Sequence, residues 1–299
     1  MRVRCFSKGK QWNCPRGEAA KKGAISKMPM TVIGGKQINY QIHGNGEPLV
    51  LLNGIMMSAL SWTPFIEVFS KHCQLILLDF IDQGFSDKAD EPYTQMLHVD
   101  MLDQLFEQLG LKNIHLLGIS YGGEIAMQYA LKYQSRLKSL ILSNTTSYTH
   151  HQLKDIGRAW IYAAKTYDGS IFFKNTIPTI YSTVFYEKNI AWLQEREKLF
   201  IKAFDQKWYD GYIRLVESAE SLNITDQLSQ IHIPTLVIGA ACDIITPVSC
   251  QEAIVREIKD AQFIVIKDCG HASMYEKPKA FAGAVLGFIM TCCDEIKIL

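Results

Sequence analysis

The sequence predicts an α/β fold, a mostly parallel β-sheet flanked by helices on both faces. Short apolar runs typical of buried strands alternate with helical stretches along most of the chain, which favours parallel strands joined by crossover helices. The chain has 299 residues, 48% of them hydrophobic, which is enough to bury a sizeable core. One central segment, residues 146–223, breaks the alternation and reads as a helical insertion.

Eight segments are predicted to be strands. The later ones are continuous apolar runs, as expected for strands buried on both faces of a sheet. The first two are separated by Gly34-Gly35-Lys36, and we expect them to form an antiparallel hairpin. The segments are Thr31–Ile33, Gln37–Ile42, Leu49–Leu52, Leu75–Leu78, Ile114–Ile119, Leu137–Ser143, Thr235–Ile238 and Phe263–Ile266.

Five helices are predicted among these strands, and one of them carries a clear apolar stripe. Within Thr94–Leu109, apolar residues recur every three or four positions, the spacing of an amphipathic helix. His98 lies in this segment and is expected on its solvated side. The five segments are Ser58–Phe69, Thr94–Leu109, Tyr121–Tyr133, Ser249–Ile258 and Pro278–Cys292.

The segment 146–223 is rich in aromatic residues and holds 15 of the 32 Phe, Trp and Tyr residues of the chain. Because about 78 residues is too long for a loop in a compact domain, we expect a helical cap inserted into a core formed by 30–145 and 224–299. The aromatic side chains either fill a small core within the cap or line an apolar pocket over the active site, since pockets are mostly apolar and lie at domain interfaces.

The formal net charge of +1 is the sum of two unlike segments. Residues 1–27 carry eight basic residues and one acidic residue, and the remaining 23 basic and 29 acidic residues give the rest of the chain a charge of −6. We expect residues 1–29 to be a basic leader that is disordered or not native. The acidic remainder argues against nucleic acid as a partner of the folded body.

The sequence shows no membrane span, export signal or metal-binding pattern. Its longest apolar runs fall far short of the ~18 residues that a spanning helix needs, and the basic N-terminus lacks the apolar region of a signal peptide, so we expect a cytoplasmic protein. The eight cysteines show no CxxC or Cys/His ligand spacing, which argues against structural zinc and against a disulfide framework.

A candidate nucleophile lies in Gly118-Ile119-Ser120-Tyr121-Gly122, directly after a predicted buried strand and directly before a predicted helix. A sharp strand-to-helix turn needs small residues on both sides of the serine, and Gly118 and Gly122 provide this clearance. The turn would lift the Ser120 hydroxyl out of the sheet. The five-residue pattern is specific in this strand–turn–helix context and weak outside it.

A serine hydroxyl needs a base to take its proton, and the base needs a carboxylate to orient it. His271 follows the last predicted strand. Asp243 follows another strand at its carboxyl end, where active sites of open α/β sheets form. Ser120, Asp243 and His271 thus occur in the chain order serine, acid, histidine. Asp268 is a rival acid near His271, but we expect it to order the loop instead.

These residues resemble those of the α/β-hydrolase family, over about Met30 to Met290. Leu51-Leu52-Asn53-Gly54-Ile55 is similar to the family's oxyanion loop, and residues 79–87 are similar to its aspartate–glycine–serine loop. The resemblance implies an eight-stranded, mostly parallel sheet with a helical cap after strand six. It also implies an oxyanion hole formed by the backbone N–H groups of Ile55 and Tyr121, and no metal or organic cofactor.

The sequence departs from the family pattern at two places. Asn53 stands where most relatives have histidine, and Ile81 with Asp82 stands where arginine and glycine are common. These departures leave the geometry of both loops open. Asn144 occupies a position where some relatives place the acid, and because it is uncharged it supports Asp243 as the acid.

Two other features carry weaker signals. His150 and Asp155 form an H-x4-D spacing that has been used as an acyltransferase signature and that is also common by chance. Cys269 lies two residues before His271, and it is either a redox-sensitive thiol or an inert buried one.

The predicted function is a serine hydrolase that cleaves a carboxylic ester or thioester through a Ser120–His271–Asp243 triad and an acyl-enzyme, with an apolar acyl group. Its predicted partner is this small-molecule substrate. Two alternatives remain open. An acyltransferase of the 3-hydroxyacyl transferase type would use an alcohol or thiol in place of water, and a non-catalytic hydrolase-fold protein would bind a ligand without turning it over.

Overall fold

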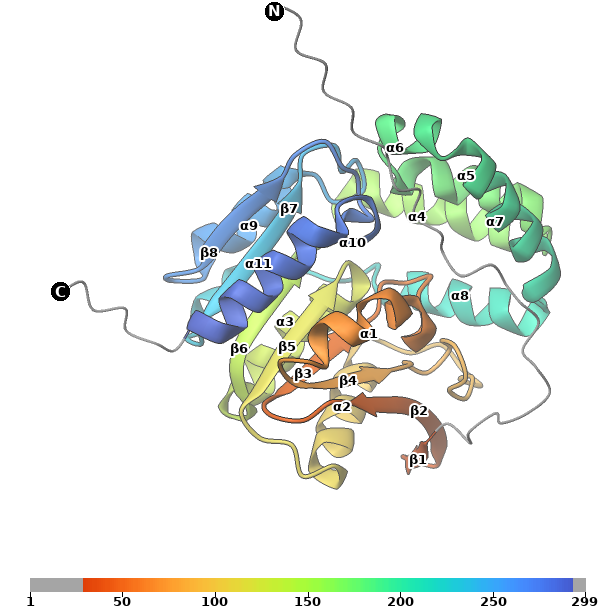
Figure 1. The fold of residues 1–299 in the computed structure, drawn as a ribbon. Coiled ribbons are helices and arrows are strands. Elements are labelled where there is room, and N and C mark those ends of the chain that lie inside the picture. The colour runs from red at the N-terminus through yellow and green to blue at the C-terminus, as the bar shows by residue number, and fades with distance from the viewer. Residues whose placement is uncertain (1–28, 293–299) are drawn as a thin grey trace, which may run out of the picture.

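The computed structural model describes residues 29–292, so the predicted leader lies almost entirely outside the described residues. An eight-stranded sheet forms its centre, as the sequence predicts, with the strand order β1-β2-β4-β3-β5-β6-β7-β8 (Figure 1). The strands are β1 (Met30–Ile33), β2 (Lys36–His43), β3 (Pro48–Leu52), β4 (Gln74–Leu78), β5 (Ile114–Ile119), β6 (Leu137–Ser143), β7 (Thr235–Ala240) and β8 (Gln262–Ile266).

Most of this sheet is parallel. β1 and β2 form the expected antiparallel hairpin, and β2 also pairs antiparallel with β4. The remaining neighbours run parallel. The carboxyl ends of the parallel strands therefore meet at one edge of the sheet, and the loops that follow them converge there.

Helices cover both faces of the sheet (Figure 1). The predicted helix over Ser58–Phe69 is divided into a short 3-10 helix, Ala59–Trp62, and a following α-helix. One face carries α2 (Met96–Gln108), α3 (Tyr121–Tyr133) and α9 (Val248–Glu257), and the other carries α1 (Thr63–Phe69) and α11 (Pro278–Thr291).

The chain between β6 and β7 folds into helices, which we call the helical insertion. In Figure 1 these helices gather at one end of the sheet. Part of the aromatic content of the insertion is buried within it, because Phe172, Tyr209 and Tyr212 pack with Trp160 in one apolar cluster. The helices are α4 (His151–Ala164), α5 (Gly169–Ile180), α6 (Thr183–Lys188), α7 (Ile190–Ala203) and α8 (Gln206–Ser218).

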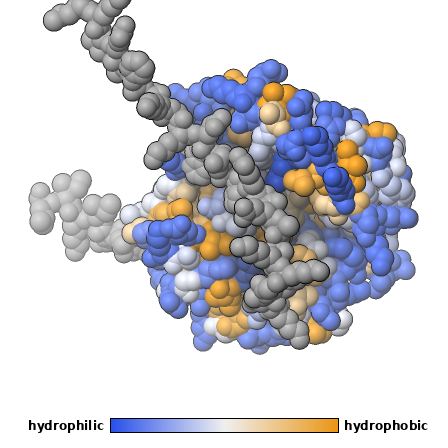
Figure 2. Space-filling model, turned by 45° about the vertical axis from the view of Figure 1, so that its right-hand side comes forward, coloured by the Kyte–Doolittle hydropathy of each residue, from blue (hydrophilic) through white to orange (hydrophobic). Residues whose placement is uncertain are grey.

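The visible surface is mainly polar. Figure 2 shows a largely hydrophilic face on which hydrophobic side chains gather in small separate groups. Within residues 29–292, no helix combines the length and the apolarity needed to cross a membrane.

His98 differs from its prediction, because it is completely buried in α2. It precedes Leu102 by one helical turn and Leu105 by two, so it lies on the apolar face of the helix. Its ring stacks on Phe80 with centroids 4.7 Å apart, and its Nδ1 lies 3.0 Å from Oη of Tyr121. Burial lowers the pKa of His98 to about 3, so the ring is neutral and forms part of the core.

Candidate active site

Ser120 lies at the turn between β5 and α3 and has a strained backbone. Its φ of 52° and ψ of −120° fall in a region that residues other than glycine rarely adopt, at a cost of about 1–3 kcal/mol that is typical of functional sites. A Cβ atom on Gly118 would lie 2.2 Å from the carbonyl oxygen of Gly122, and one on Gly122 would lie 2.5 Å from that of Leu52. The turn therefore requires glycine at both positions.

The structure brings the three residues of the predicted triad together. His271 lies on the loop between β8 and α10 (Ser273–Glu276), and its Nε2 is 2.9 Å from Oγ of Ser120. Its Nδ1 is 2.8 Å from Oδ2 of Asp243, which follows β7. Asp243 and His271 are buried, whereas Ser120 is half-buried. This chain of contacts can take a proton from a serine hydroxyl and stabilise the resulting imidazolium.

The Asp243 carboxylate is held by further donors. Its Oδ1 accepts hydrogen bonds from the backbone N–H groups of Ile245 and Thr246, at 2.9 and 3.0 Å. Its Oδ2 accepts from Oγ1 of Thr246 and from Nδ2 of Asn144, each at 3.0 Å. Burial alone would raise the pKa of Asp243, but the attraction of His271 and these hydrogen bonds outweigh it and hold the pKa below its ordinary value. The carboxylate is therefore ionised and fixed in orientation.

Asn144 connects the acid to a second helix. It follows β6 directly, and its side-chain amide donates to Asp243, as described above. Its Oδ1 accepts hydrogen bonds from Oγ of Ser273 at 2.6 Å and from Oγ of Ser143 at 3.0 Å. Ser273 begins α10, two residues after His271. Asn144 thus orients Asp243 and is also hydrogen-bonded to the helix that follows His271. The sequence identifies Asn144 only as an uncharged residue and does not predict this role.

The predicted oxyanion loop follows β3 and lies against Ser120. A Cβ atom on Gly54 would lie 3.6 Å from Cβ of Ser120. The backbone N–H groups of Ile55 and Tyr121 make no hydrogen bond to any other residue between 29 and 292. Both residues line a cavity together with Ser120. Unused backbone donors beside a serine hydroxyl are what the oxyanion of an acyl-transfer reaction requires.

Asn53, the first departure from the family pattern, fixes this loop. Its side chain is fully buried, and its Nδ2 donates to the carbonyl oxygen of Leu78 at 2.8 Å and to Oε1 of Gln83 at 3.0 Å. Its Oδ1 accepts from Nε1 of Trp62 at 2.8 Å. Gln83 in turn donates to the carbonyl oxygen of Gly54 at 3.0 Å. Sequence reasoning assigned no role to either partner, because Trp62 lies outside the recognised motifs and Gln83, although within the loop 79–87, is not one of the residues that define that motif.

Asp82, at the second departure, is paired with the helical insertion. Its φ is 72°, and its side chain is buried. Arg214 of α8 donates to both carboxylate oxygens, from Nε at 2.9 Å and from Nη2 at 2.6 Å, the bidentate geometry that arginine favours. Because Asp82 directly precedes Gln83, this ion pair connects the insertion to the residues that hold the oxyanion loop.

Glu276 of α10 makes a second connection between the insertion and the site. Its Oε1 accepts from the backbone N–H groups of Ser182 at 2.8 Å and of Gly270 at 3.0 Å. Its Oε2 accepts from Oγ of Ser182 at 2.5 Å. Ser182 is the N-cap of α6, and Gly270 directly precedes His271. Glu276 therefore holds the histidine loop against the insertion.

A cavity of about 630 Å³ opens beside Ser120 and His271, and we call it the large chamber. Its lining is mostly apolar and comes from the oxyanion loop and from the insertion. The sequence leaves two locations possible for the aromatic residues of the insertion, a core within the insertion or the wall of a pocket. The structure contains both. The aromatic residues of the insertion that line the chamber are Trp160, Phe173, Tyr181, Trp192, Phe200, Phe204 and Trp208.

His150 and Cys269 make contacts typical of structural residues and form no hydrogen bond with Ser120. His150 is the N-cap of α4, and its Nδ1 accepts from the backbone N–H of Leu153 at 3.2 Å. Asp155 is exposed and faces Arg158 at 3.3 Å, so the H-x4-D spacing does not assemble with Ser120. Cys269 is buried, and burial raises its pKa to about 12, so its thiol is not a reactive thiolate. Across residues 29–292, no three His, Cys, Asp or Glu side chains converge as metal ligands would.

Comparison with known proteins places this geometry among related folds. Residues 47–278 match the family model described as alpha/beta hydrolase fold. MGS-M2, an alpha/beta hydrolase enzyme from a Medee basin deep-sea metagenome library, has a crystal structure that superposes with a TM-score of 0.87, at 40% identity over 90% of this chain and 100% of that chain. The 3-oxoadipate enol-lactonase 1 of Acinetobacter baylyi is 25% identical over 85% of this chain and 94% of its own length. The proline iminopeptidase of Saccharolobus solfataricus is 26% identical over 84% and 87%.

Proposed function

The chain belongs to the alpha/beta hydrolase fold family, and we propose that it acts there as a serine hydrolase on a carboxylic ester or thioester. The observation that carries this proposal is the continuous series of contacts from Asp243 through His271 to Ser120, at 2.8 and 2.9 Å. The similarity to an enol-lactonase supports an ester-type substrate, because a lactone is a cyclic ester.

The proposed reaction has two halves. In the first, Oγ of Ser120 attacks the acyl carbon while Nε2 of His271 takes the serine proton, and Asp243 stabilises the imidazolium. The bond to the leaving group then breaks, and His271 gives that group the proton. In the second half, His271 takes a proton from water, the water oxygen attacks the acyl carbon, and the bond to Ser120 breaks. The products are the carboxylic acid and the alcohol or thiol, and the proton returns to Ser120.

The backbone N–H groups of Ile55 and Tyr121 are proposed to bind the oxyanion in both halves of the reaction. Tyr121 begins α3, and the N-terminus of a helix favours negative charge. Losing one oxyanion donor typically costs ~10²–10³ in rate. Because these donors belong to the main chain, replacing the side chain of Ile55 or Tyr121 is expected to cost less activity than replacing Ser120.

We further propose that residues 146–223 act as a cap over the site, and that residues 30–145 and 224–292 form the catalytic core; residues 293–299, which the sequence assigns to this core, lie outside the described residues. The insertion supplies the aromatic part of the large chamber, as described above. Burying apolar substrate surface against this wall would contribute about 25 cal/mol per Å². The chamber therefore supports an apolar substrate.

Fluorophosphonate labelling tests the proposed function, because these reagents react with activated serines. We expect the wild-type chain to be labelled and to hydrolyse 4-nitrophenyl esters, and Ser120→Ala to lose the label and about 10⁴-fold or more of kcat. Ser170→Ala is the matched control, because it removes a serine hydroxyl from α5 at a position that lines neither the large chamber nor the oxyanion loop.

Two outcomes would change the proposal. If Ser120→Ala is labelled and hydrolyses esters at the wild-type level, Ser120 has no part in the mechanism. Faster acyl transfer to an added thiol or alcohol than to water, measured by product analysis, would identify the chain as an acyltransferase instead.

A further inference from the structure

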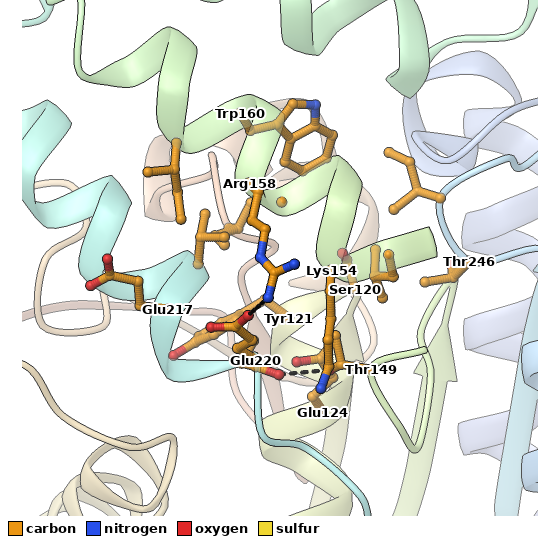
Figure 3. A pocket seen from close by; sticks show the side chains of 17 residues that line it. Ser120, Tyr121, Glu124, Thr149, Lys154, Arg158, Trp160, Glu217, Glu220 and Thr246 are labelled. Atoms are coloured by element: carbon orange, nitrogen blue, oxygen red, sulfur yellow. Dashed lines mark hydrogen bonds and ion pairs between the residues drawn. The ribbon is translucent and has the colours of Figure 1, made fainter. Parts of the chain in front are cut away.

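A second cavity meets the large chamber at Ser120, and we call it the small chamber. It has a volume of about 80 Å³ and lies between α4, the end of α8 and the first turn of α3 (Figure 3). Ile55, Ser120 and Trp160 line both chambers. An acyl carbon bonded to Ser120 therefore has two spaces of very unequal size around it.

The lining of the small chamber is mostly apolar, and an ion pair lies at its outer end. Nη2 of Arg158, on α4, lies 3.0 Å from Oε1 of Glu220, which follows α8 (Figure 3). Both of these side chains are about half exposed, so the pair lies at the surface. Besides the shared residues, the apolar lining comes from Leu153, Gly157, Ile161, Val216, Ala219 and Ile245.

Two further ionisable side chains lie at the base of the small chamber. In Figure 3 the Lys154 side chain runs down from α4 toward Glu124. Glu124 accepts a hydrogen bond from Nε2 of Gln95 at 2.5 Å, and burial raises its pKa to about 8, so its carboxyl group is uncharged at neutral pH. The base of the chamber thus adds one cation, while the wall beside Ser120 remains apolar.

The chemistry of the proposed reaction decides which part of the substrate each chamber receives. His271 must give a proton to the leaving-group atom, so that atom has to lie next to Nε2 of His271. His271 lines the large chamber, and it is absent from the small chamber's lining as far as the described residues define it. The acyl substituent of the tetrahedral carbon points away from the leaving group, and therefore away from His271.

We propose that the small chamber binds the acyl group and that the large chamber binds the leaving group. This assignment rests on the proposed function. The small chamber, at about 80 Å³, is much smaller than the large chamber, at about 630 Å³, so it favours a short acyl chain. The substrate class is a short-chain acyl ester of a large apolar alcohol, or the corresponding thioester.

Two series of esters, each used below its critical micelle concentration, test this assignment. The first keeps the 4-nitrophenyl leaving group and lengthens the acyl chain from acetyl to dodecanoyl. The second keeps the acetyl group and lengthens the alcohol from ethyl to decyl. We expect kcat/KM to fall about tenfold or more between butanoyl and octanoyl in the first series, and to rise with alcohol length in the second, because the large chamber buries the added surface.

A matched pair of variants separates the two chambers. Val216→Ala shortens a wall of the small chamber and is expected to raise the hexanoyl-to-acetyl ratio of kcat/KM about tenfold. Leu199→Ala truncates an aliphatic side chain of the large chamber. It is expected to change the dependence on alcohol length and to leave the hexanoyl-to-acetyl ratio as in the wild type.

The possible failures can be told apart. Ser120-dependent hydrolysis that prefers long acyl chains and short alcohols would overturn the chamber assignment and leave the proposed function in place. An unchanged hexanoyl-to-acetyl ratio in folded Val216→Ala would also overturn the assignment. Turnover and labelling that do not depend on Ser120 would overturn the proposed function, and the assignment with it.

Discussion

The edge of the sheet and the helical insertion meet at Ser120, and they are held together by different interactions. At the edge of the sheet, Asp243 and Asn53 are buried polar groups fixed by several hydrogen bonds each. In the insertion, aromatic rings pack against one another, as in the pair Phe204 and Trp208 with centroids 3.8 Å apart. Hydrogen bonds are directional and apolar contacts are not. The sheet edge therefore positions the side chains of Ser120, His271 and Asp243, while the insertion shapes the space around them.

This difference means that substitutions in the two regions should have separable effects. Changes at the sheet edge are expected to alter the rate of reaction at nearly constant stability. Changes in the polar contacts between the insertion and the core are expected to alter stability as well.

Asp243→Asn is expected to have the largest effect on rate after loss of the serine itself. An amide would donate to Nδ1 of His271 and favour the wrong tautomer, which lowers kcat by ~10⁴ in serine proteases with the same arrangement. Steady-state hydrolysis of 4-nitrophenyl acetate measures this loss. Asp268→Asn is the control, because Asp268 is exposed and lies in the same loop as His271, and it should keep the wild-type rate. Equal losses in both variants would contradict the assignment of Asp243.

Arg214→Met tests the connection between the insertion and the oxyanion loop. It would leave the buried carboxylate of Asp82 without its bidentate partner, and removing one member of a buried pair costs about 3 kcal/mol or more. Urea unfolding measures this change in the free energy of unfolding. We also expect a lower kcat, since Asp82 precedes Gln83, which holds the oxyanion loop. A variant as stable and as active as the wild type would show that the insertion and the loop are independent.

Glu124→Gln is expected to change the pH dependence of stability. Burial raises the pKa of Glu124 from about 4.5 in the unfolded chain to about 8 in the folded protein. Between these values the folded protein keeps a proton that the unfolded chain releases, so the free energy of unfolding falls as pH rises, and the stabilisation is lost above pH 8. The variant should be more stable than the wild type at pH 8, by on the order of 1–3 kcal/mol.

Thermal unfolding from pH 5 to 9 measures this difference. Glu107→Gln, which removes an exposed carboxylate from α2, is the matched control and should follow the wild-type curve. If the stability of Glu124→Gln falls with pH as steeply as that of the wild type, the buried carboxyl group does not cause the pH dependence.

Arg158→Met is expected to have the smallest effect. It breaks the ion pair with Glu220, whose members are about half exposed, and exposed pairs contribute about 0–1 kcal/mol. Urea unfolding beside Arg214→Met gives a direct comparison of an exposed and a largely shielded arginine on the same insertion. Equal costs for both substitutions would show that the outer end of the small chamber is more tightly packed than its exposure indicates.

The part of the molecule that the sequence predicts well is local. β5 and β6 have the predicted bounds. A strand buried on both faces is a mostly apolar run, and the polar residues that flank the run mark its ends. The strained turn at Ser120 is also local, since its glycines lie two residues on either side. Asp243 and His271 follow strand ends, so the parallel order of the sheet suffices to bring them to the same edge.

The parts that the sequence did not predict depend on contacts between distant residues. Arg214 and Asp82 are 132 positions apart, and neither carries a local pattern that names the other. Asn53 could be recognised as a departure, but its partners Trp62 and Gln83 become visible only when β3 and β4 are adjacent. The sizes of the two chambers depend on how α4, α7 and α8 pack, which periodicity within one helix does not determine.

The hydrogen bonds of Glu276 have a consequence for how a ligand reaches the half-buried Ser120. It fixes the insertion at Ser182, between α5 and α6, while Arg214 fixes it separately on α8. A rotation of the whole insertion as one rigid body would have to break both attachments, and it would pull on the histidine loop through Gly270. The helix α7 lies between the two attachments along the chain and borders the large chamber. Entry and exit are therefore expected to proceed by outward displacement of α7 alone, which leaves the proton-transfer geometry undisturbed during each passage.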